Sequence, residues 1–237
     1  RSHKIPEEIG KLTIAQISDV HIGLIVRESR LKRILAKVKE AEPDIFVSTG
    51  DLVDGQPDNI RGMDQLFRSI NPRLGAFAVT GNHEFYAGLS RSIDFTEEAG
   101  FRLLRGEGVT VNGLINIIGV DDPAGIRFGL RKQISEKALL ARFSQDRFTL
   151  VLKHRPVIDG EAIGLFDLQL SGHTHKGQIF PFSLITKIFH PALAGLYPVG
   201  RNAHLYVCRG SGTWGPPIRF LVPPEVVIVE LVHESKR

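Results

Sequence analysis

The chain has 237 residues and a mass of 26.3 kDa, and 42% of its residues are hydrophobic and 24% charged. This composition excludes a disordered or fibrous chain, and the length is sufficient to bury a substantial core. Lys and Arg exceed Asp and Glu by only 30 to 26, so the charge gives little support to nucleic acid as a partner. The single cysteine, Cys208, excludes an internal disulfide and an all-thiolate metal site.

Strands and helices are predicted to alternate in the first hundred residues. Short apolar runs typical of buried strands cover 12–18, 44–49 and 75–80. Apolar residues at helical spacing follow them over 31–38, 63–70 and, less regularly, 89–98. This alternation favours an α/β fold with a parallel or mixed central sheet.

The second half of the chain is predicted to contain more strands. Residues 109–111 and 114–120 flank Asn112-Gly113, a dipeptide typical of a tight hairpin. Ser135 is a candidate cap for a helix through Phe143, and further strands are expected over 148–153, 167–171, 203–208 and 226–232. Because no linker, charge block or repeat interrupts 1–237, we predict a single domain with two sheets and helices outside.

The chain shows no segment that is typical of a membrane span or a signal peptide. Its longest apolar runs have the length of strands, and its basic start is not followed by an apolar region. We therefore expect a soluble domain as given. A longer precursor that is exported or membrane-associated stays open.

Side chains that can bind metal follow five of the predicted strands. They are Asp19 and His21, Asp51, Asn82 beside His83, His154, and finally His173 and His175. In open α/β sheets ligands bind at the carboxyl ends of strands, so we expect these five loops to converge. Glycines at 50, 81 and 172 are expected to let the backbone turn sharply there.

The donor types predict the kind of metal centre. Seven ligands exceed the needs of one tetrahedral ion but suit two ions that share a carboxylate. Imidazole and carboxylate without thiolate favour Mn, Fe or Zn over Mg or Ca. Two such ions, roughly 3.5–4 Å apart, can clamp a phosphoryl group and generate hydroxide for in-line attack.

Five motifs, in this order, resemble those of the calcineurin-like metallophosphoesterases. They are Asp19-x-His21, Gly50-Asp51-x-x-Asp54, Gly81-Asn82-His83-Glu84, His154, and Gly172-His173-x-His175. The resemblance implies a four-layer α/β/β/α sandwich of two mixed sheets. It implies Asp19, His21, Asp51 and His175 on one metal, and Asp51, Asn82, His154 and His173 on the other. Asp51 would bridge, and His83 would stabilise the phosphate or protonate the leaving oxygen.

A longer pattern over 172–181 and 210–212 is similar to the bacterial branch that includes YkuE-type and YaeI-type phosphodiesterases. Members of that branch often carry an export signal or membrane helices before the catalytic domain. Glu84 stands where many members of the family have Asp, which leaves the geometry of that contact open. We expect Asp54 to hold a turn or a neighbouring ligand rather than to bind metal.

Residues 179–198 form a long apolar connection that needs burial somewhere. It is either a lid or small helix packed on the sandwich, or a surface for an acyl chain or a membrane interface beside Lys176, Lys187 and Arg201. Arg155 and Lys176 are candidate substrate contacts.

The predicted function is hydrolysis of a phosphodiester or pyrophosphate by attack of a metal-bridged hydroxide. The substrate would be a phosphorylated small molecule or a lipid-linked or cell-envelope phosphate. A cyclic or simple diester, or a monoester, is the alternative within the same chemistry. A non-catalytic metal-binding scaffold on the same fold is the alternative of a different class.

Overall fold

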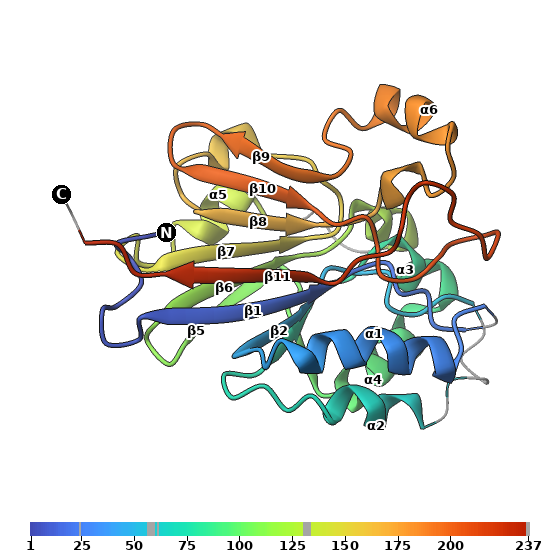
Figure 1. The fold of residues 1–237 in the computed structure, drawn as a ribbon. Helices are drawn as coiled ribbons and strands as arrows, with labels where there is room; N and C mark the ends of the chain where they lie inside the picture. The colour runs from blue at the N-terminus through green and yellow to red at the C-terminus, as the bar shows by residue number, and fades with distance from the viewer. Residues whose placement is uncertain (24, 56–59, 61, 130–133, 236–237) are drawn as a thin grey trace.

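The computed structural model describes residues 1–235 except 24, 56–59, 61 and 130–133. The first sheet contains β1 (Lys11–Ile17), β2 (Ile45–Ser48), β3 (Ala76–Ala78), β4 (Phe101–Leu103) and β11 (Val227–Val232). The second contains β5 (Glu107–Val111), β6 (Ile115–Val120), β7 (Phe148–Lys153), β8 (Leu168–Ser171), β9 (Gly195–Val199) and β10 (Ala203–Val207). Their orders are β11-β1-β2-β3-β4 and β5-β6-β7-β8-β10-β9 (Figure 1).

Both sheets are mixed, as predicted. Strands β1 to β4 are parallel, and β11 pairs antiparallel with β1 at the edge. In the second sheet β6, β7, β8 and β10 are parallel, while β5 and β9 pair antiparallel at the two edges. The hairpin expected around Asn112-Gly113 is the β5–β6 pair. The parallel central strands all end at the same side of the molecule, which brings their following loops together.

Helices cover the outer faces of the two sheets. Against the first sheet lie α1 (Glu28–Glu40), α2 (Met63–Arg68) and α4 (Leu89–Glu98), and α5 (Glu136–Leu140) lies outside the second (Figure 1). Helix α1 buries Leu31, Ile34, Leu35 and Val38, the positions its periodicity predicted. The buried apolar residues in the described part of the chain form three clusters. One lies between the first sheet and its helices, one between the two sheets, and one on the outer face of the second sheet. The four-layer α/β/β/α expectation is therefore confirmed.

Several elements differ from those predicted. The helix expected over 135–143 begins as expected, with Ser135 Oγ accepting from Ala138 N, but ends at Leu140. Helix α3 (Asn82–Ala87), β4 and β9 have no counterpart in the sequence interpretation, because each is short and lacks a clear apolar period. The structure also contains the short 3₁₀ helices η2 (Pro123–Phe128), η3 (Gly160–Ala162) and η4 (His175–Gly177).

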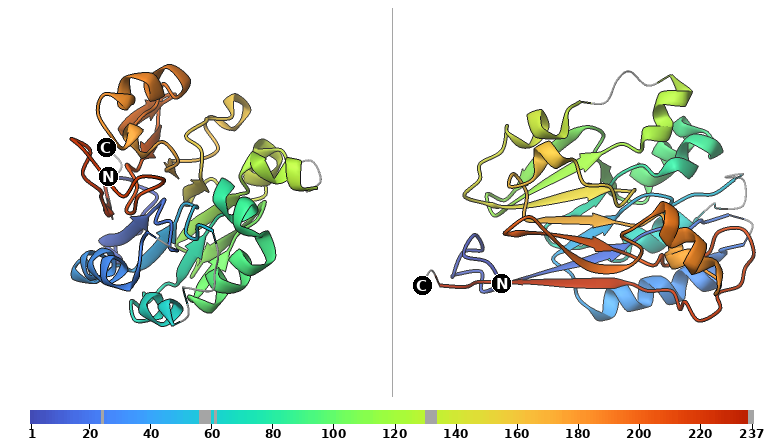
Figure 2. Two further views of the ribbon diagram at one scale, coloured as in Figure 1. Left: turned by 90° about the vertical axis from the view of Figure 1, so that its right-hand side faces the viewer. Right: turned by 90° about the horizontal axis from the view of Figure 1, so that it is seen from above.

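The connection over 179–198 contains α6 (Phe182–Phe189) and the start of β9. Helix α6 stands at one end of the molecule, and both chain termini lie at the other (Figures 1 and 2). The helix has no buried residue, so it is not enclosed by the sandwich. Among the described residues, no helix has the length and apolarity that a membrane crossing requires.

Candidate metal centre

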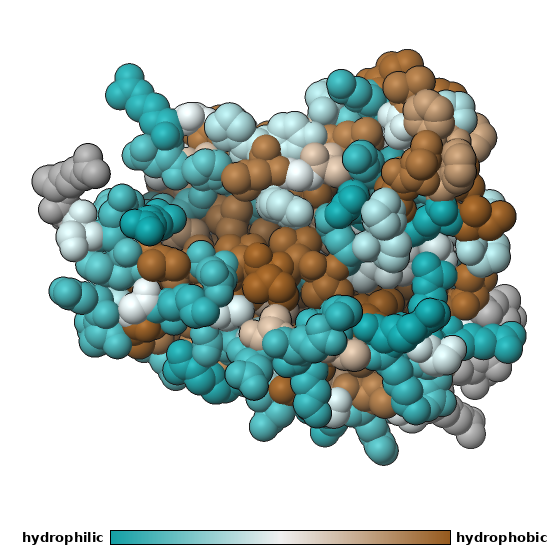
Figure 3. All heavy atoms as spheres, viewed as in Figure 1, coloured by the Kyte–Doolittle hydropathy of each residue, from teal (hydrophilic) through white to brown (hydrophobic). Residues whose placement is uncertain are grey.

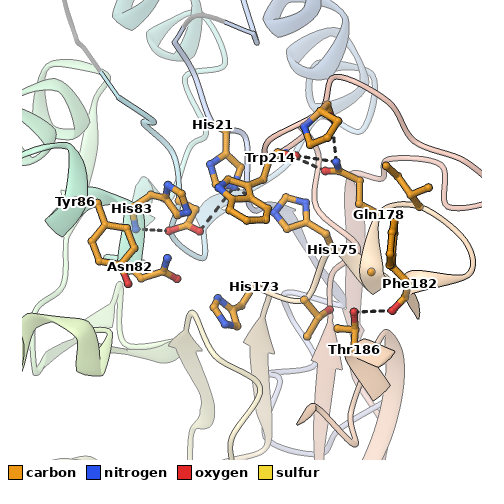
Figure 4. Close-up of a pocket in the computed structure, with 15 residues that line it drawn as sticks. His21, Asn82, His83, Tyr86, His173, His175, Gln178, Phe182, Thr186 and Trp214 are labelled. Carbon is orange, nitrogen blue, oxygen red and sulfur yellow. Dashed lines mark hydrogen bonds and ion pairs between the residues drawn. The ribbon is translucent and has the colours of Figure 1, made fainter. Parts of the chain in front are cut away.

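The loops after five parallel strands meet at one end of the two sheets and carry all the predicted metal ligands. Asp19 and His21 follow β1, Asp51 follows β2, and Asn82 opens α3 directly after the loop that leaves β3. His154 follows β7, and His173 and His175 follow β8. Most of these side chains line one cavity, which Figure 4 shows between α3 on one side and α6 on the other. The predicted convergence of the five loops is therefore what the structure shows.

The backbone is unusual at these ligands. Asp19, His21, Asp51, His173 and His175 all have positive φ, between 48° and 73°, although none is glycine. Non-glycine residues rarely adopt this conformation, and where it occurs the surrounding structure must hold it. Five such residues in one cluster are typical of a functional site, where side chains are aimed at a common point at some cost in stability.

Two buried carboxylates lie at the centre of the cluster. Asp19 accepts hydrogen bonds from the backbone N–H of His173, at 3.0 Å to each oxygen. Asp51 Oδ1 accepts from the backbone N–H of His83 at 2.8 Å, while its Oδ2 lies 3.2 Å from His154 Nε2 and 3.7 Å from His21 Nε2. Asp51 therefore stands between histidines that come from different loops.

Three overlapping groups of side chains have ligand atoms within 4.8 Å of one another. They are Asp19, His21 and His175, then Asp51, His154 and His173, and finally His21, Asp51 and His83. The first two groups belong to the two metals that the resemblance implies. The third includes Asp51 and His21, so it connects them at the position where a bridging carboxylate is expected.

The facing nitrogen atoms fit a shared cation. His21 Nε2 lies 3.1 Å from His175 Nε2, and His173 Nδ1 lies 3.1 Å from His154 Nε2. Two nitrogen ligands at about 2.0–2.1 Å from one tetrahedral ion stand roughly 3.3 Å apart. These separations are therefore close to those of paired ligands.

Hydrogen bonds and burial set the protonation of these histidines. His154 Nδ1 donates to the carbonyl of Thr49 at 2.8 Å, which leaves Nε2 to face Asp51. Burial lowers the pKa of His154, but the charge and hydrogen bond of Asp51, with the charges of Asp19 and Asp122, together outweigh it and raise that pKa to about 10. Burial, with the charge of His154, lowers the pKa of His173 to about 3. A metal ion must therefore displace a proton from His154 but finds His173 neutral.

Asn82 gives a further test of the fit. Its side-chain oxygen is buried and has no hydrogen-bond partner among the described residues. Buried polar atoms are nearly always paired, so an orphaned acceptor beside carboxylates and imidazoles indicates a cation. Asn82 also lines the cavity, together with His21, Asp51 and His173 (Figure 4). The donor set therefore fits the metals predicted from the sequence.

His83 lies at the same cavity and is held by Asp54. His83 Nδ1 donates to Asp54 Oδ1 at 3.0 Å, and Asp54 Oδ2 lies 3.4 Å from His21 Nδ1. Asp54 thus contacts two histidines of the site, as expected of a residue that positions ligands. Burial lowers the pKa of His83, but the hydrogen bond to Asp54 and the charges of Asp51, Asp54 and Glu84 together outweigh it, so the pKa lies above its ordinary value. Nε2 is left for a substrate.

Glu84 fixes the loop that carries Asp51. Its two buried carboxylate oxygens accept from the backbone N–H groups of Gly81, Asp51, Leu52 and Val53, at 2.6–3.3 Å. Glu84, whose contact could not be predicted from the sequence, therefore joins the loop after β2 to the loop after β3. It holds the backbone of Asp51 rather than reaching the cavity.

We expect Glu84→Gln to destabilise the protein. One oxygen becomes an NH₂ group that faces two backbone donors, which costs roughly 2–4 kcal/mol of unfolding free energy. Urea denaturation measures this loss, and Glu97→Gln at an exposed position of α4 is the matched control. Equal midpoints for the two variants would contradict this role of Glu84.

The glycines of the motifs act in two ways. Gly50 has φ +92° and serves the sharp turn that was predicted. Gly172 is required for space instead, because a Cβ there would overlap Ser18 Oγ and Asp19 Oδ2. The same reason holds at Gly81, where a Cβ would overlap Asp51.

We expect Gly172→Ala to push Asp19 out of position. The added methyl group should lower the unfolding free energy by about 1–3 kcal/mol and reduce the metal content. Thermal unfolding and elemental analysis measure the two effects. Gly160→Ala, where nothing lies within 4 Å of the added Cβ, is the control. A variant that binds metal like the unmodified protein would show that the loop can yield.

The two candidate substrate contacts lie apart from the cavity wall. Arg155 donates to both oxygens of the buried Asp122 at 2.8 and 3.2 Å, and neither Arg155 nor Lys176 lines the cavity. Asp122 also accepts from Ala124 N and thereby caps the start of η2. A substrate role for Arg155 and Lys176 stays a prediction.

Sequence reasoning missed several residues at the site. Arg219 Nη2 lies 3.1 Å from His175 Nδ1, and its side chain donates to the carbonyls of Arg209, Gly210 and Gly212. The rings of Tyr86 and Trp214 lie 5.4 and 6.0 Å from that of His83. No motif includes these residues, and only the fold brings them to the ligands.

The cavity combines the polar cluster with an apolar wall. Its volume is about 630 Å³. Most of the ligands and His83 line it together with Ile179, Phe182, Trp214 and Pro216. Phe182 lies across the cavity from His83, while Trp214 lies close to His21 and His83 (Figure 4). It can therefore accept a polar group at the ligands with an apolar or bulky substituent beside it.

Comparisons with known proteins agree with this site. An uncharacterized metallophosphoesterase of Aquifex aeolicus is 41% identical over 232 residues, covering 97% of this chain and 88% of its own. The uncharacterized metallophosphoesterase YkuE of Bacillus subtilis is 31% identical and covers 98% and 82%. A transmembrane protein with metallophosphoesterase domain from Danio rerio is 32% identical and covers 96% and 55%. The chain thus spans about half of that relative, and 61% of a Campylobacter jejuni metallophosphoesterase.

A solved structure and a family model give the same assignment. A 5'-nucleotidase precursor from Thermus thermophilus aligns with a TM-score of 0.51 at 18% identity, over 94% of this chain and 54% of its own, and shows a shared fold. The model of the calcineurin-like phosphoesterases matches residues 12–177, which hold all seven predicted ligands. The chain therefore belongs to the calcineurin-like phosphoesterase family, a family of metal-dependent phosphoesterases.

Proposed function

We propose that this chain hydrolyses a phosphodiester or pyrophosphate bond with the help of two transition-metal ions. The observation that carries the proposal is the meeting of two ligand groups at Asp51, with His83 beside them at the same cavity. A binding scaffold has no need of a histidine that is held by Asp54 and directed at the space between the ligands and the apolar wall.

The side chains divide between two positions. Asp19, His21 and His175 with Asp51 would hold one ion, and Asp51, Asn82, His154 and His173 the other. Imidazole and carboxylate donors suit Mn, Fe or Zn. When bound, such a pair of ions polarises the phosphoryl oxygens and lowers the pKa of a water for in-line attack.

The chain's own residues do the remaining work. His83 keeps one N–H on Asp54 and presents Nε2 to the substrate, where it can donate to a phosphoryl oxygen or to the leaving oxygen. The apolar wall gives room for a second substituent on phosphorus, which favours a diester or pyrophosphate over a monoester. The same wall supports a lipid-linked phosphate over a small soluble one.

Elemental analysis of the purified protein and hydrolysis of bis-p-nitrophenyl phosphate test the proposal together. We expect about two metal ions per chain, loss of turnover after chelation, and recovery when Mn²⁺ is added. One metal ion per chain with full turnover would overturn the two-metal arrangement. Neither metal nor turnover with any divalent ion would favour the binding scaffold.

A further inference from the structure

Residues 180–189, which contain helix α6, and the loop over 214–221 form an exposed apolar surface, which we call the rim. Helix α6 buries none of its residues. The side chains of the rim are 47–76% exposed: Phe180, Phe182, Leu184, Ile185, Ile188 and Phe189 from the first segment, and Trp214, Ile218, Phe220 and Leu221 from the second. Figure 3 shows a concentration of hydrophobic residues at the end of the molecule where α6 stands. So large an exposed apolar area on a protein surface indicates a binding site.

The two segments of the rim are fastened to each other. Ile179 and Phe220 form a parallel bridge, and Phe180 N donates to Phe220 O at 3.1 Å. The side chain of Gln178 donates to Trp214 O at 2.7 Å and accepts from Trp214 N at 2.8 Å. The rim is therefore one surface, although residues 190–213 separate its two parts in the sequence.

The rim continues into the catalytic cavity. Phe182 and Thr186 of α6 line that cavity, and so do Trp214 and Pro216 of the second segment (Figure 4). His83 and most of the metal-binding side chains line the same cavity. A molecule whose apolar part rests on the rim can thus place a phosphate at the ligands.

The charge of this part of the chain selects the occupant. No Asp or Glu occurs between 168 and 224, a stretch of 57 residues. Of its five cations, Arg209 is paired with Glu225, Arg219 donates to backbone carbonyls, and Arg201 lies beside the N-terminal residues. The two that remain near α6 are Lys176 of η4, which contacts α6, and Lys187. The rest of the chain has 25 Lys and Arg against 26 Asp and Glu. Lys187 is an exposed residue of α6 itself. Apolar side chains with cations and without acids fit an anionic lipid surface. Two copies of this face would instead bring like charges together.

We propose that the rim docks on an anionic lipid surface and that the cavity takes its phosphoester from an amphiphile in that surface. The second half rests on the proposed function, whereas docking does not. The apolar tail would lie along α6 and Trp214, and the phosphate would reach the ligands beside His83. This commits the substrate class to phosphodiesters or pyrophosphates that carry a long apolar chain.

Vesicle sedimentation tests the docking without catalysis. We expect the protein to bind vesicles of phosphatidylcholine with about 30% phosphatidylglycerol better than phosphatidylcholine alone. The double variant Ile188→Ser/Phe189→Ser replaces the two most exposed hydrophobic side chains of α6, neither of which lines the cavity. Its binding should fall at least about tenfold. The control Ile163→Ser/Ile228→Ser, at 45% and 41% exposed positions outside the rim, should bind like the unmodified protein.

Two chromogenic diesters separate docking from chemistry. Bis-p-nitrophenyl phosphate is soluble, whereas p-nitrophenyl hexadecyl phosphate resides in the vesicle and has the same leaving group. We expect Ile188→Ser/Phe189→Ser to hydrolyse the soluble diester at the unmodified rate. Its rate with the vesicle-bound diester should fall about tenfold. Equal vesicle binding by the rim variant and the unmodified protein would overturn the docking, and so would a dimer in solution that the rim substitutions dissociate. If neither the unmodified protein nor the variants hydrolysed the soluble diester, the proposed function would be refuted. The vesicle-binding result would be unaffected, because sedimentation does not depend on catalysis.

Discussion

Asp51→Asn should abolish most of the activity and part of the metal content. Asparagine has the same shape and keeps one oxygen to accept from His83 N, so the loop should fold as before. It removes the charge that faces His154 Nε2 and His21 Nε2. A carboxylate shared by two ions cannot be replaced by a neutral amide, and the loss of several kcal/mol of transition-state stabilisation lowers kcat roughly 1,000-fold or more.

Elemental analysis and the rate with bis-p-nitrophenyl phosphate measure the effect of Asp51→Asn. Thermal unfolding in the presence of a chelator checks that the substitution has not disturbed the fold. Asp94→Asn, at an exposed position of α4, is the matched control and should keep both metal and turnover. Full metal content with full turnover in Asp51→Asn would exclude Asp51 as the bridging residue.

Much of the fold could be predicted because its signals are local. Apolar runs of strand length and the helical spacing over 31–38 reappear as β1, β2 and α1 with boundaries shifted by a few residues. The elements that were missed have weak local signals. Strand β4 has three residues, and β9 contains Pro198, which removes a backbone donor and is tolerated there because β9 is an edge strand.

The candidate ligands could also be predicted, because each follows a strand and the parallel topology makes the strand ends converge. Their backbone conformation could not, since positive φ at Asp19, His21 and Asp51 is imposed by the packed loops and not by residue type. The place of Arg219 in the site could not be predicted either, for another reason. It lies 44 residues after His175 in the sequence and meets it only through the fold of the loop that follows β10.

The segment 179–198 shows the limit of pattern reading most clearly. Its apolar content was compatible with a packed helix and with an exposed one, because hydropathy does not say what a helix packs against. The structure forms the helix and leaves it without a buried residue. Its partner in the rim, 214–221, carried no signal of its own, since turn-rich sequence with Pro216 and Pro217 predicts a loop and nothing about its exposure.

His83→Ala separates catalysis from metal binding. His83 is held by Asp54 and has no backbone role beyond its own N–H to Asp51, which alanine keeps. We therefore expect the metal content to stay the same while kcat falls by about 100- to 10,000-fold, the range for a general acid. His204→Ala, at an exposed position of β10, is the control and should change neither quantity.

The leaving group then distinguishes the two roles open to His83. If Nε2 protonates the leaving oxygen, the loss in His83→Ala should be larger for diphenyl phosphate than for bis-p-nitrophenyl phosphate, because phenolate is the poorer leaving group and needs the proton more. If His83 only stabilises a phosphoryl oxygen, the two losses should be equal, since that oxygen is the same in both substrates. The raised pKa and the hydrogen bond to Asp54 keep a proton on Nε2, which both roles require, so the comparison of the two losses decides between them. Loss of metal together with activity would place His83 among the ligands instead.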